Sequence, residues 1–334
     1  MRVSRRTLQA LLAFALLAVI AFTLPAFVSD FRAQQFAYVG IYLIALTGLN
    51  ILTGYTGQIS LGHGAFMAIG GYTTAILMLD HGVKDIATIP VAILVAGAAG
   101  ILFGLPAARL SGLYLALATF AIAVATPAVI KKFEGFTGGG SGINLFGTPE
   151  LTASLKPVHL LGFELNFNNW LYYLSWTVAL IGYVVAWLLL RGRTGRAFRA
   201  VRDSETAAVS FGVSLTRTKV LAFGISAAYA GAAGALFAIA TTFVNPDTFP
   251  VALSIFLLVG VVVSGLGSLT GLIAGAIFIQ FLPLWAQSVS KSAGAPAVVY
   301  GVILILLVLA LPDGAAGLIS RVAKLLRRRD TEVS

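Results

Sequence analysis

Six polar side chains crowd into one glycine-rich stretch of an otherwise apolar sequence: Asn50, Thr53, Tyr55, Gln58, Ser60 and His63. Their hydroxyl, amide and imidazole groups could hydrogen-bond a zwitterionic ligand. Backbone N–H and C=O groups freed by a break in a helix would add partners for its carboxylate and ammonium groups. The alternative is that these side chains satisfy one another at a helix turn buried in protein. The stretch is a candidate lining of a translocation pathway, and a structural role is the competing interpretation.

A second feature is a polar segment over residues 191–219, with the basic residues Arg191, Arg193, Arg196, Arg199, Arg202, Arg217 and Lys219. Within it, residues 203–212 predict a short helix with both ends marked. Asp203 is a suitable N-cap, Glu205 lies in the first turn where the helix dipole favours a negative charge, and Gly212 supplies a left-handed stop. A helix of about eight residues is not stable alone, so it requires a packing partner.

Two interpretations of this segment remain open. The capped helix is suited to docking on a soluble partner protein. A solvated loop would instead place its arginines on anionic lipid, each contributing about 1 kcal/mol near the surface. Arg196, Arg199 and Arg202 recur every three residues, and such a basic stripe suits the membrane surface in either case.

Other kinds of site find little support in the residues. The chain has no cysteine, and its three histidines, His63, His81 and His159, lie far apart, so no metal is expected. Nothing orders Ser204 with a histidine as a catalytic triad, and we do not expect an enzyme. No phosphate-binding loop of the form G-x-x-x-x-G-K-[ST] occurs. No cofactor is therefore expected in this chain, and ATP with its Mg²⁺ would be bound by partner subunits.

The acidic residues bear on the energy source that the chain itself could use. Ion-coupled carriers usually need an ionisable group inside the membrane. All 12 Asp and Glu residues fall in predicted loops or tails, so proton or sodium coupling has no obvious carrier. An ion-coupled carrier or channel is accordingly a distant alternative to a transporter that is driven by a partner ATPase.

Composition places the chain in a membrane. Of 334 residues, 59% are hydrophobic and 10% are charged, whereas soluble domains carry about 25% charged residues. The sequence predicts an all-α fold, a polytopic transmembrane helical bundle that forms a single domain over residues 1–334. Most of the 22 Lys and Arg residues fall on one side of the predicted spans, which places both termini in the cytoplasm. The net charge of +10 therefore indicates orientation and not a nucleic-acid partner.

The apolar runs predict about ten membrane spans, within a range of about eight to ten. Residues 1–7 form a cytoplasmic N-terminus, 131–168 a periplasmic loop, 191–219 a cytoplasmic loop and 312–334 a basic cytoplasmic tail. The first run also resembles a signal peptide, although no clean cleavage site follows it. A re-entrant helix around 55–60 or 265–271 would also fit. The predicted spans are residues 8–28, 36–52, 61–79, 86–108, 113–130, 170–190, 220–243, 251–266, 269–287 and 297–311.

Glycines mark the expected hinges and close helix contacts: Gly54, Gly57, Gly62, Gly64, Gly265, Gly267 and Gly271. Small residues let membrane helices approach closely. A weak similarity between residues 57–66 and 265–275, both Gly/Ser-rich connections between apolar helices, hints at inverted structural halves.

The polar segment resembles a docking motif. Glu205-x-Ala207-Ala208-x-x-x-Gly212 is similar to the E-A-A-x-x-x-G loop of bacterial ABC importer permeases, which in that family meets a groove on the ATPase. Further stretches resemble the branched-chain amino acid ABC transporter permease family: residues 48–66 with 70–72, residues 195–203 with 219–223, and residues 265–271. The long outer loop resembles that of the M-type of the two paired permeases. Leu272 departs from the pattern, since a proline often stands there in the family.

The resemblance implies the permease subunit of an ATP-driven importer, which forms half of the translocation pathway. It implies a second, H-type permease, two ATP-binding subunits and a substrate-binding protein as partners, in the bacterial plasma (inner) membrane. Leucine, isoleucine or valine is the expected substrate, and urea, short amides or aromatic acids are alternatives. The residues implied in ATPase coupling are Asp203, Glu205, Ala207, Ala208 and Gly212.

Overall fold

The computed structural model describes Pro25 and residues 28–147, 158–160, 163–289, 295–310 and 314–318. The predicted first span over 8–28, apart from its end, and the predicted N-terminal segment 1–7 lie outside the described residues. So do most of the tail 312–334 and part of the loop 131–168.

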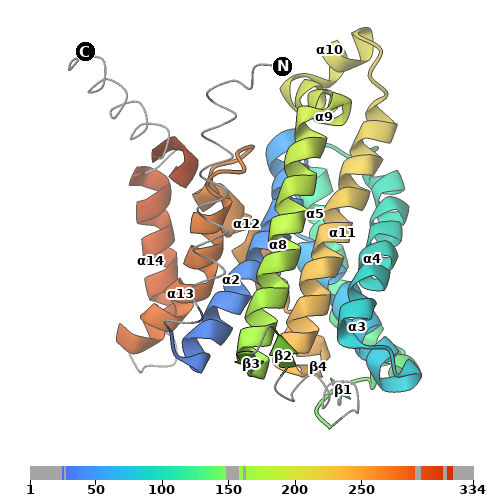
Figure 1. Cartoon of the computed structure of the whole chain (residues 1–334). Helices are drawn as coiled ribbons and strands as arrows, with labels where there is room; N and C mark the ends of the chain where they lie inside the picture. The colour runs from blue at the N-terminus through green and yellow to red at the C-terminus, as the bar shows by residue number, and fades with distance from the viewer. Residues whose placement is uncertain are drawn as a thin grey trace, which may run out of the picture.

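Long helices run side by side and form a bundle (Figure 1). An all-α fold is thereby confirmed, and the observed bounds follow the apolar runs of the sequence within a few residues at most ends. The helices of the bundle are α2 (Asp30–Leu49), α3 (His63–His81), α4 (Asp85–Ala107), α5 (Gly112–Lys132), α8 (Phe167–Arg191), α11 (Leu215–Thr241), α12 (Val251–Ser264), α13 (Leu272–Val289) and α14 (Ala295–Ala310).

The two ends of the bundle differ in structure (Figure 1). At one end, α9 (Arg193–Asp203) and α10 (Glu205–Ser210) project as a helical hairpin. At the other end, β1 (Ile143–Asn144) pairs with β4 (Phe243–Val244), and β2 (Val158–Leu160) pairs with β3 (Phe163–Leu165), both antiparallel. The short helices α6 (Glu134–Thr137) and η3 (Pro246–Thr248) adjoin these strands in the sequence. We call the two ends the hairpin end and the strand end.

Among the described residues, fewer helices are long and apolar enough to cross a membrane than the sequence predicts. In the described part of the chain, 6 helical segments are long and apolar enough to cross a membrane: Asp30–Tyr55, Asp85–Ala107, Gly112–Lys132, Phe167–Arg191, Leu215–Thr241 and Pro246–Ser264. The helix α13 is a shorter apolar helix by these criteria, and α3 is not among the 6. The count of ten, like the location of the termini, stays a prediction.

The span predicted over 36–52 ends too early, but the break expected over residues 54–58 includes the observed end of the helix. The helix α2 continues without interruption into a π-helical turn, η2 (Asn50–Tyr55), and the helical backbone ends only at Gly57, whose φ of +72° lies in the left-handed region. The continuation is stabilised because the Leu52 carbonyl accepts both the Gln58 N–H at 3.2 Å and the Thr56 hydroxyl at 2.5 Å. Gly54 was expected to end the helix, but it stays helical and serves a close contact that is described below.

The helices α2 and α11 occupy the centre of the bundle. The apolar window of Asp30–Tyr55 is 83% buried and that of Leu215–Thr241 is 67% buried, against 28% for each of the spans α4, α5 and α8. Small residues permit this packing. A Cβ atom at Gly70 would meet the carbonyl oxygen of Gly231, and one at Gly234 would meet that of Met67.

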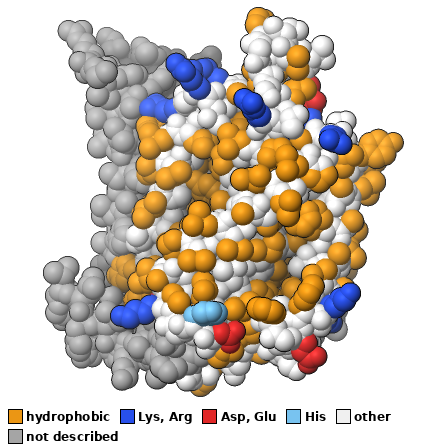
Figure 2. Space-filling view, turned by 90° about the vertical axis from the view of Figure 1, so that its right-hand side faces the viewer, with side chains coloured by type: hydrophobic (Ala, Val, Ile, Leu, Met, Phe, Trp, Pro, Cys, Tyr) orange, Lys and Arg blue, Asp and Glu red, His pale blue; other side chains and the backbone are white. Residues whose placement is uncertain are grey.

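The outer face of the bundle is apolar across its middle. Figure 2 shows hydrophobic side chains over the central band of the face that carries α4, and Lys, Arg, Asp and Glu side chains only near its two ends. The leucines Leu94 and Leu102 of this helix are 71% and 66% exposed. Because a soluble protein does not leave so much contiguous apolar surface in water, the chain is a multi-pass membrane protein.

The substitution Gly234→Val is expected to push α11 away from α3. Its side chain would meet the Met67 backbone, which cannot rotate away, so we expect a loss of about 3 kcal/mol or more in the free energy of unfolding. Thermal unfolding and size-exclusion profiles of the solubilised protein would measure the effect. Gly301→Val in α14 is the control, because a Cβ atom there meets no described atom within 4 Å. Equal behaviour of both variants would contradict the packing described here.

Candidate functional site

The α9–α10 hairpin begins where α8 ends, at Gly192. Its first helix turns an apolar face inward, since Phe198 and Val201 are buried. The second helix is N-capped by Ser204, whose side chain accepts a hydrogen bond from the Ala207 N–H at 3.2 Å. Asp203 was the predicted cap, and this prediction is wrong. Asp203 is the last residue of α9. The cap shifts by one residue because α9 occupies the sequence up to Asp203.

The helix α10 is a single short piece, as the sequence predicts, with 6 residues. Gly212 follows it with a φ of +80°, in the left-handed region. The predicted left-handed stop is confirmed at this position. Ala208 is buried, so it packs inward against the rest of the chain.

Two of the three arginines in the predicted basic stripe hydrogen-bond backbone carbonyls. Arg202 donates to the Gly54 carbonyl at 2.6 Å, and Arg199 donates to the Leu190 carbonyl at 3.2 Å. Arg196 is exposed on the same helix. A role of the stripe at lipid headgroups stays a prediction, and the described contact of Arg202 joins the hairpin to η2.

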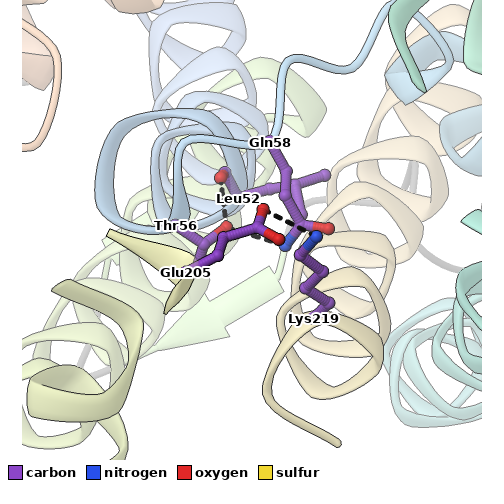
Figure 3. Close-up of polar contacts among 5 residues, drawn as sticks. All are labelled: Leu52, Thr56, Gln58, Glu205 and Lys219. Atoms are coloured by element: carbon purple, nitrogen blue, oxygen red, sulfur yellow. Dashed lines mark hydrogen bonds and ion pairs between the residues drawn. The ribbon is translucent and has the colours of Figure 1, made fainter. Parts of the chain in front are cut away.

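An ion pair joins the hairpin to α11. The Lys219 ammonium lies 2.7 Å from a Glu205 carboxylate oxygen, with the Lys219 side chain 5% exposed and that of Glu205 45% exposed (Figure 3). The sequence predicts Lys219 at the end of the cytoplasmic loop 191–219, whereas α11 begins at Leu215 and buries this lysine. The signal that could have revealed the pair is the position of Lys219, directly before an apolar run with an acid nearby in the sequence.

Asn50 serves as a clamp between distant segments. It is fully buried, its side-chain N–H donates to the Ser268 carbonyl at 2.9 Å, and its carbonyl accepts from the Gly267 N–H at 3.0 Å. A Cβ atom at Gly54 would collide with the Gly267 backbone. The end of α2 thus lies directly against the turn over residues 265–271. The Asn50 side-chain amide is hydrogen-bonded within the protein, which supports the structural interpretation for Asn50.

Thr53 and Gln58 bond within the same stretch. The Thr53 hydroxyl donates to the Gln58 carbonyl at 3.1 Å, and the Gln58 side-chain amide donates to the Thr56 hydroxyl at 2.9 Å. Gln58 lies next to the Glu205–Lys219 pair (Figure 3). Its side-chain carbonyl oxygen is buried and has no hydrogen-bond partner in the described part of the chain.

The remaining polar candidates lie along the same connection. Tyr55 is buried in η2, and the Ser60 hydroxyl accepts from the Gly62 N–H at 3.3 Å. His63 begins α3, where one ring nitrogen, Nδ1, lies 3.5 Å from the Ser226 hydroxyl. The other, Nε2, is buried without a partner among the described residues. Of the six candidates, Gln58 and His63 therefore retain unused polar atoms, while Asn50 and Thr53 have structural partners.

The predicted hinge glycines lie at close contacts or turns. A Cβ atom at Gly62 would come within 2.8 Å of the Thr119 carbonyl, and one at Gly64 within 2.8 Å of the Ser254 hydroxyl. One at Gly271 would collide with the Ser264 carbonyl. Gly57, Gly265 and Gly267 have positive φ, which suits glycine at turns.

No group of three or more His, Cys, Asp or Glu side chains that could hold a metal ion occurs in the described part of the chain.

The family described as "branched-chain amino acid transport system / permease component" matches residues 32–311. The chain belongs to this family. The match runs from the first turn of α2 to the end of α14 and includes the α9–α10 hairpin and the clamp at Asn50. The geometry above therefore belongs to the body of a membrane permease.

Individual relatives agree with this assignment. The high-affinity branched-chain amino acid transport system permease protein LivM of Salmonella typhimurium is 37% identical over 286 residues, covering 81% of this chain and 67% of the relative. LivM of Escherichia coli K12 is 36% identical over 278 residues, covering 79% and 65%. The chain thus spans about two thirds of the length of these relatives. The autoinducer 2 import system permease protein LsrC of Enterobacter sp. is 29% identical over 285 residues, covering 82% and 77%. No solved structure matches the chain.

Proposed function

We propose that this chain is the transmembrane permease subunit of an ATP-driven ABC importer for leucine, isoleucine and valine. It forms half of the translocation pathway and receives its energy from separate ATPase subunits, which bind ATP and Mg²⁺. The family match over residues 32–311 carries the proposal, because it extends across the whole described bundle. Two relatives of 37% and 36% identity are named as permeases for branched-chain amino acids, which supports the substrate class.

The α9–α10 hairpin is the proposed docking site for an ATPase subunit. Phe211 is 87% exposed and Val209 is 53% exposed at its tip. Exposed large apolar side chains mark interaction surfaces. The opposite side of the hairpin is fixed to the bundle by the Glu205–Lys219 pair and by the Arg202–Gly54 hydrogen bond. An anchored hairpin with an apolar tip is suited to transmit a push from a partner into the bundle.

The proposed assembly contains this chain, an H-type permease, two ATP-binding subunits and a substrate-binding protein. Under this proposal the hairpin end faces the cytoplasm of a bacterium and the strand end faces the binding protein across the plasma (inner) membrane. The chain crosses about ten times with both termini inside, as the basic residues suggest. The proposed coupling residues are Asp203, Glu205, Ala207, Ala208 and Gly212. Glu205 anchors the docking helix α10 through Lys219, Ala208 packs the inner face of α10 against the chain, and Gly212 follows the end of α10 in the left-handed conformation.

The proposal is tested by reconstituting the subunits in liposomes with a binding protein loaded with radioactive leucine. We expect uptake that requires internal ATP and continues after ionophores dissipate proton and sodium gradients. Uptake without ATP, or uptake abolished by the ionophores, would reject ATP as the energy source. Competition by urea, short amides, aromatic acids and autoinducer 2 tests the substrate class, since only branched-chain amino acids are expected to compete strongly.

A further inference from the structure

Lys219 carries a buried ammonium group that has more donors than acceptors around it. Its side chain is 5% exposed, and an ammonium group has three N–H donors. Among the described residues its one acceptor is the Glu205 carboxylate, at 2.7 Å. A charge removed from water is stable only when it is paired and hydrogen-bonded. Lys219 therefore needs another acceptor whenever Glu205 moves away.

Of the two partners, Glu205 is the one more open to displacement. Its side chain is 45% exposed, and it lies in the first turn of α10, a helix of 6 residues. The α9–α10 hairpin projects from the bundle (Figure 1), and its tip is the proposed contact for an ATPase subunit. Lys219 lies in α11, whose apolar window is 67% buried. A displaced hairpin would thus draw Glu205 away from a lysine that stays in the bundle.

Gln58 has the acceptor that Lys219 would need. Its side chain is 4% exposed, and its Oε1 atom is buried with no hydrogen-bond partner in the part of the chain that the structure describes. Figure 3 shows the Gln58 amide and the Lys219 ammonium group pointing toward one another from opposite sides. The turn η2, which precedes Gln58, contacts α11. An unused acceptor and an incompletely paired donor are therefore buried close together.

Neighbouring hydrogen bonds determine which end of the Gln58 amide faces Lys219. The Thr56 hydroxyl donates its only proton to the Leu52 carbonyl at 2.5 Å, so it can only accept from Gln58. The Nε2 group of Gln58 therefore faces Thr56, at 2.9 Å, and Oε1 faces away from it. The Gln58 backbone is fixed as well, because its N–H donates to the Leu52 carbonyl and its carbonyl accepts from the Thr53 hydroxyl. Gln58 is thus a preoriented acceptor attached to the end of η2.

We propose that Gln58 is the second acceptor of Lys219, and that the ammonium group passes from Glu205 to the Gln58 side-chain carbonyl when an ATPase subunit displaces α10. The exchange keeps the Lys219 ammonium group hydrogen-bonded in both positions of the hairpin. It also ties α11 to η2 when the hairpin is displaced. The inference rests on the proposed function, because the ATPase supplies the displacement, and it adds Gln58 as a positioning residue for coupling.

Charge rescue tests whether position 58 reaches Lys219. In the Glu205→Ala background, Gln58→Glu supplies a new carboxylate and is expected to restore most of the lost unfolding temperature. Gln58→Leu, of similar size and without an acceptor, is the matched control and is expected to restore none. In the Lys219→Met background, Gln58→Glu is expected to lower the unfolding temperature, because the new carboxylate is then buried without a partner. Equal unfolding temperatures of the two double variants in the Glu205→Ala background would overturn the proposal.

Coupled transport tests whether the importer uses the exchange. Gln58→Leu alone keeps the Glu205–Lys219 pair, so its unfolding temperature is expected to stay close to that of the unmodified protein. The number of leucine molecules imported per ATP hydrolysed is expected to fall about tenfold, within the range of about 5- to 150-fold that coupling between sites usually spans. Thr47→Val is the control, because the Thr47 hydroxyl bonds only within its own helix, and its ratio is expected to be unchanged.

The outcomes separate this inference from the proposed function. Absence of ATP-dependent uptake by the unmodified importer overturns both. Normal uptake by the unmodified importer with an unchanged ratio in Gln58→Leu overturns this inference alone. A fall of both the ratio and the unfolding temperature in Gln58→Leu would assign Gln58 a merely structural role and would overturn it as well.

Discussion

Glu205→Ala is expected to weaken the anchor of the docking hairpin and to abolish most coupled transport. The change leaves the Lys219 ammonium buried without the carboxylate that now lies 2.7 Å away. Removal of one partner from a buried ion pair lowers the free energy of unfolding by about 3–5 kcal/mol, and the decrease is smaller when the pair is open to solvent. Because Glu205 is 45% exposed, we expect a decrease of about 1–3 kcal/mol in the free energy of unfolding. Thermal unfolding of the solubilised protein and ATP-driven uptake are the measurements.

A double-mutant cycle separates the ion pair from a general effect of losing an acid. Lys219→Met removes the buried charge, and the Glu205 carboxylate can then be hydrated. The loss in the free energy of unfolding is therefore expected to be smaller than that for Glu205→Ala. In the double variant Glu205→Ala, Lys219→Met, much of the lost stability is expected to return, because no unpaired charge stays buried. Glu134→Ala, at an exposed acid of the strand end, serves as the control. Strictly additive losses would contradict the role of the pair.

Asn50→Leu is expected to release the 265–271 turn from the end of α2. The substitution keeps a similar volume but leaves the Gly267 N–H and the Ser268 carbonyl without their partners. Each unsatisfied buried polar group costs about 1–3 kcal/mol, so for the two groups we expect a total loss of about 2–6 kcal/mol. Transport is expected to fall as well, because the clamp joins segments that also contact Arg202.

The freed turn is detected through cysteine labelling. The chain contains no cysteine, so Leu266→Cys in the turn provides a single reactive thiol. Its reaction with a maleimide is expected to accelerate in the Asn50→Leu background. Thr47→Val is the matched control, because the Thr47 hydroxyl donates to the Leu43 carbonyl within its own helix. An unchanged labelling rate together with unchanged unfolding would show that Asn50 is not a clamp.

These contacts link the hairpin to the two most buried spans. Arg202 bonds the Gly54 carbonyl in η2, which continues α2, and Glu205 pairs with Lys219 in α11. Asn50 then joins α2 to the turn before α13. A displacement of the hairpin by a partner would therefore reach the centre of the bundle through short contacts, without passing through the lipid-facing helices.

The sequence predicts the structure correctly where local composition determines it. The spans over 86–108 and 170–190 were predicted within a few residues of α4 and α8, because long apolar runs and their flanking polar residues mark the ends of membrane helices. The short helix before Gly212 was also predicted, since a left-handed glycine stop is a local signal. Its N-cap was misplaced by one residue, because Asp203 and Ser204 are both good caps and only the end of α9 selects between them.

The site was less predictable because its contacts are distant in the sequence. Asn50 bonds Ser268 and Gly267 more than 200 positions away, and no local pattern encodes that pairing. The π-helical turn η2 was missed because Gly54 normally suggests a break, whereas here it permits close approach to Gly267. Lys219 is predicted in the loop because the apolar run begins at residue 220, and its ion pair with Glu205 depends on how α10 packs beside α11.

The central claim is that a partner ATPase engages this permease through the tip of the α9–α10 hairpin. Co-purification of the ATPase with Phe211→Ser tests it most directly, with Phe136→Ser as the control, since Phe136 is 72% exposed but lies in α6 at the strand end. We predict that Phe211→Ser loses most of the bound ATPase while its unfolding temperature is unchanged, and that Phe136→Ser retains it. Retention of the ATPase by Phe211→Ser at the level of the unmodified chain would contradict the account.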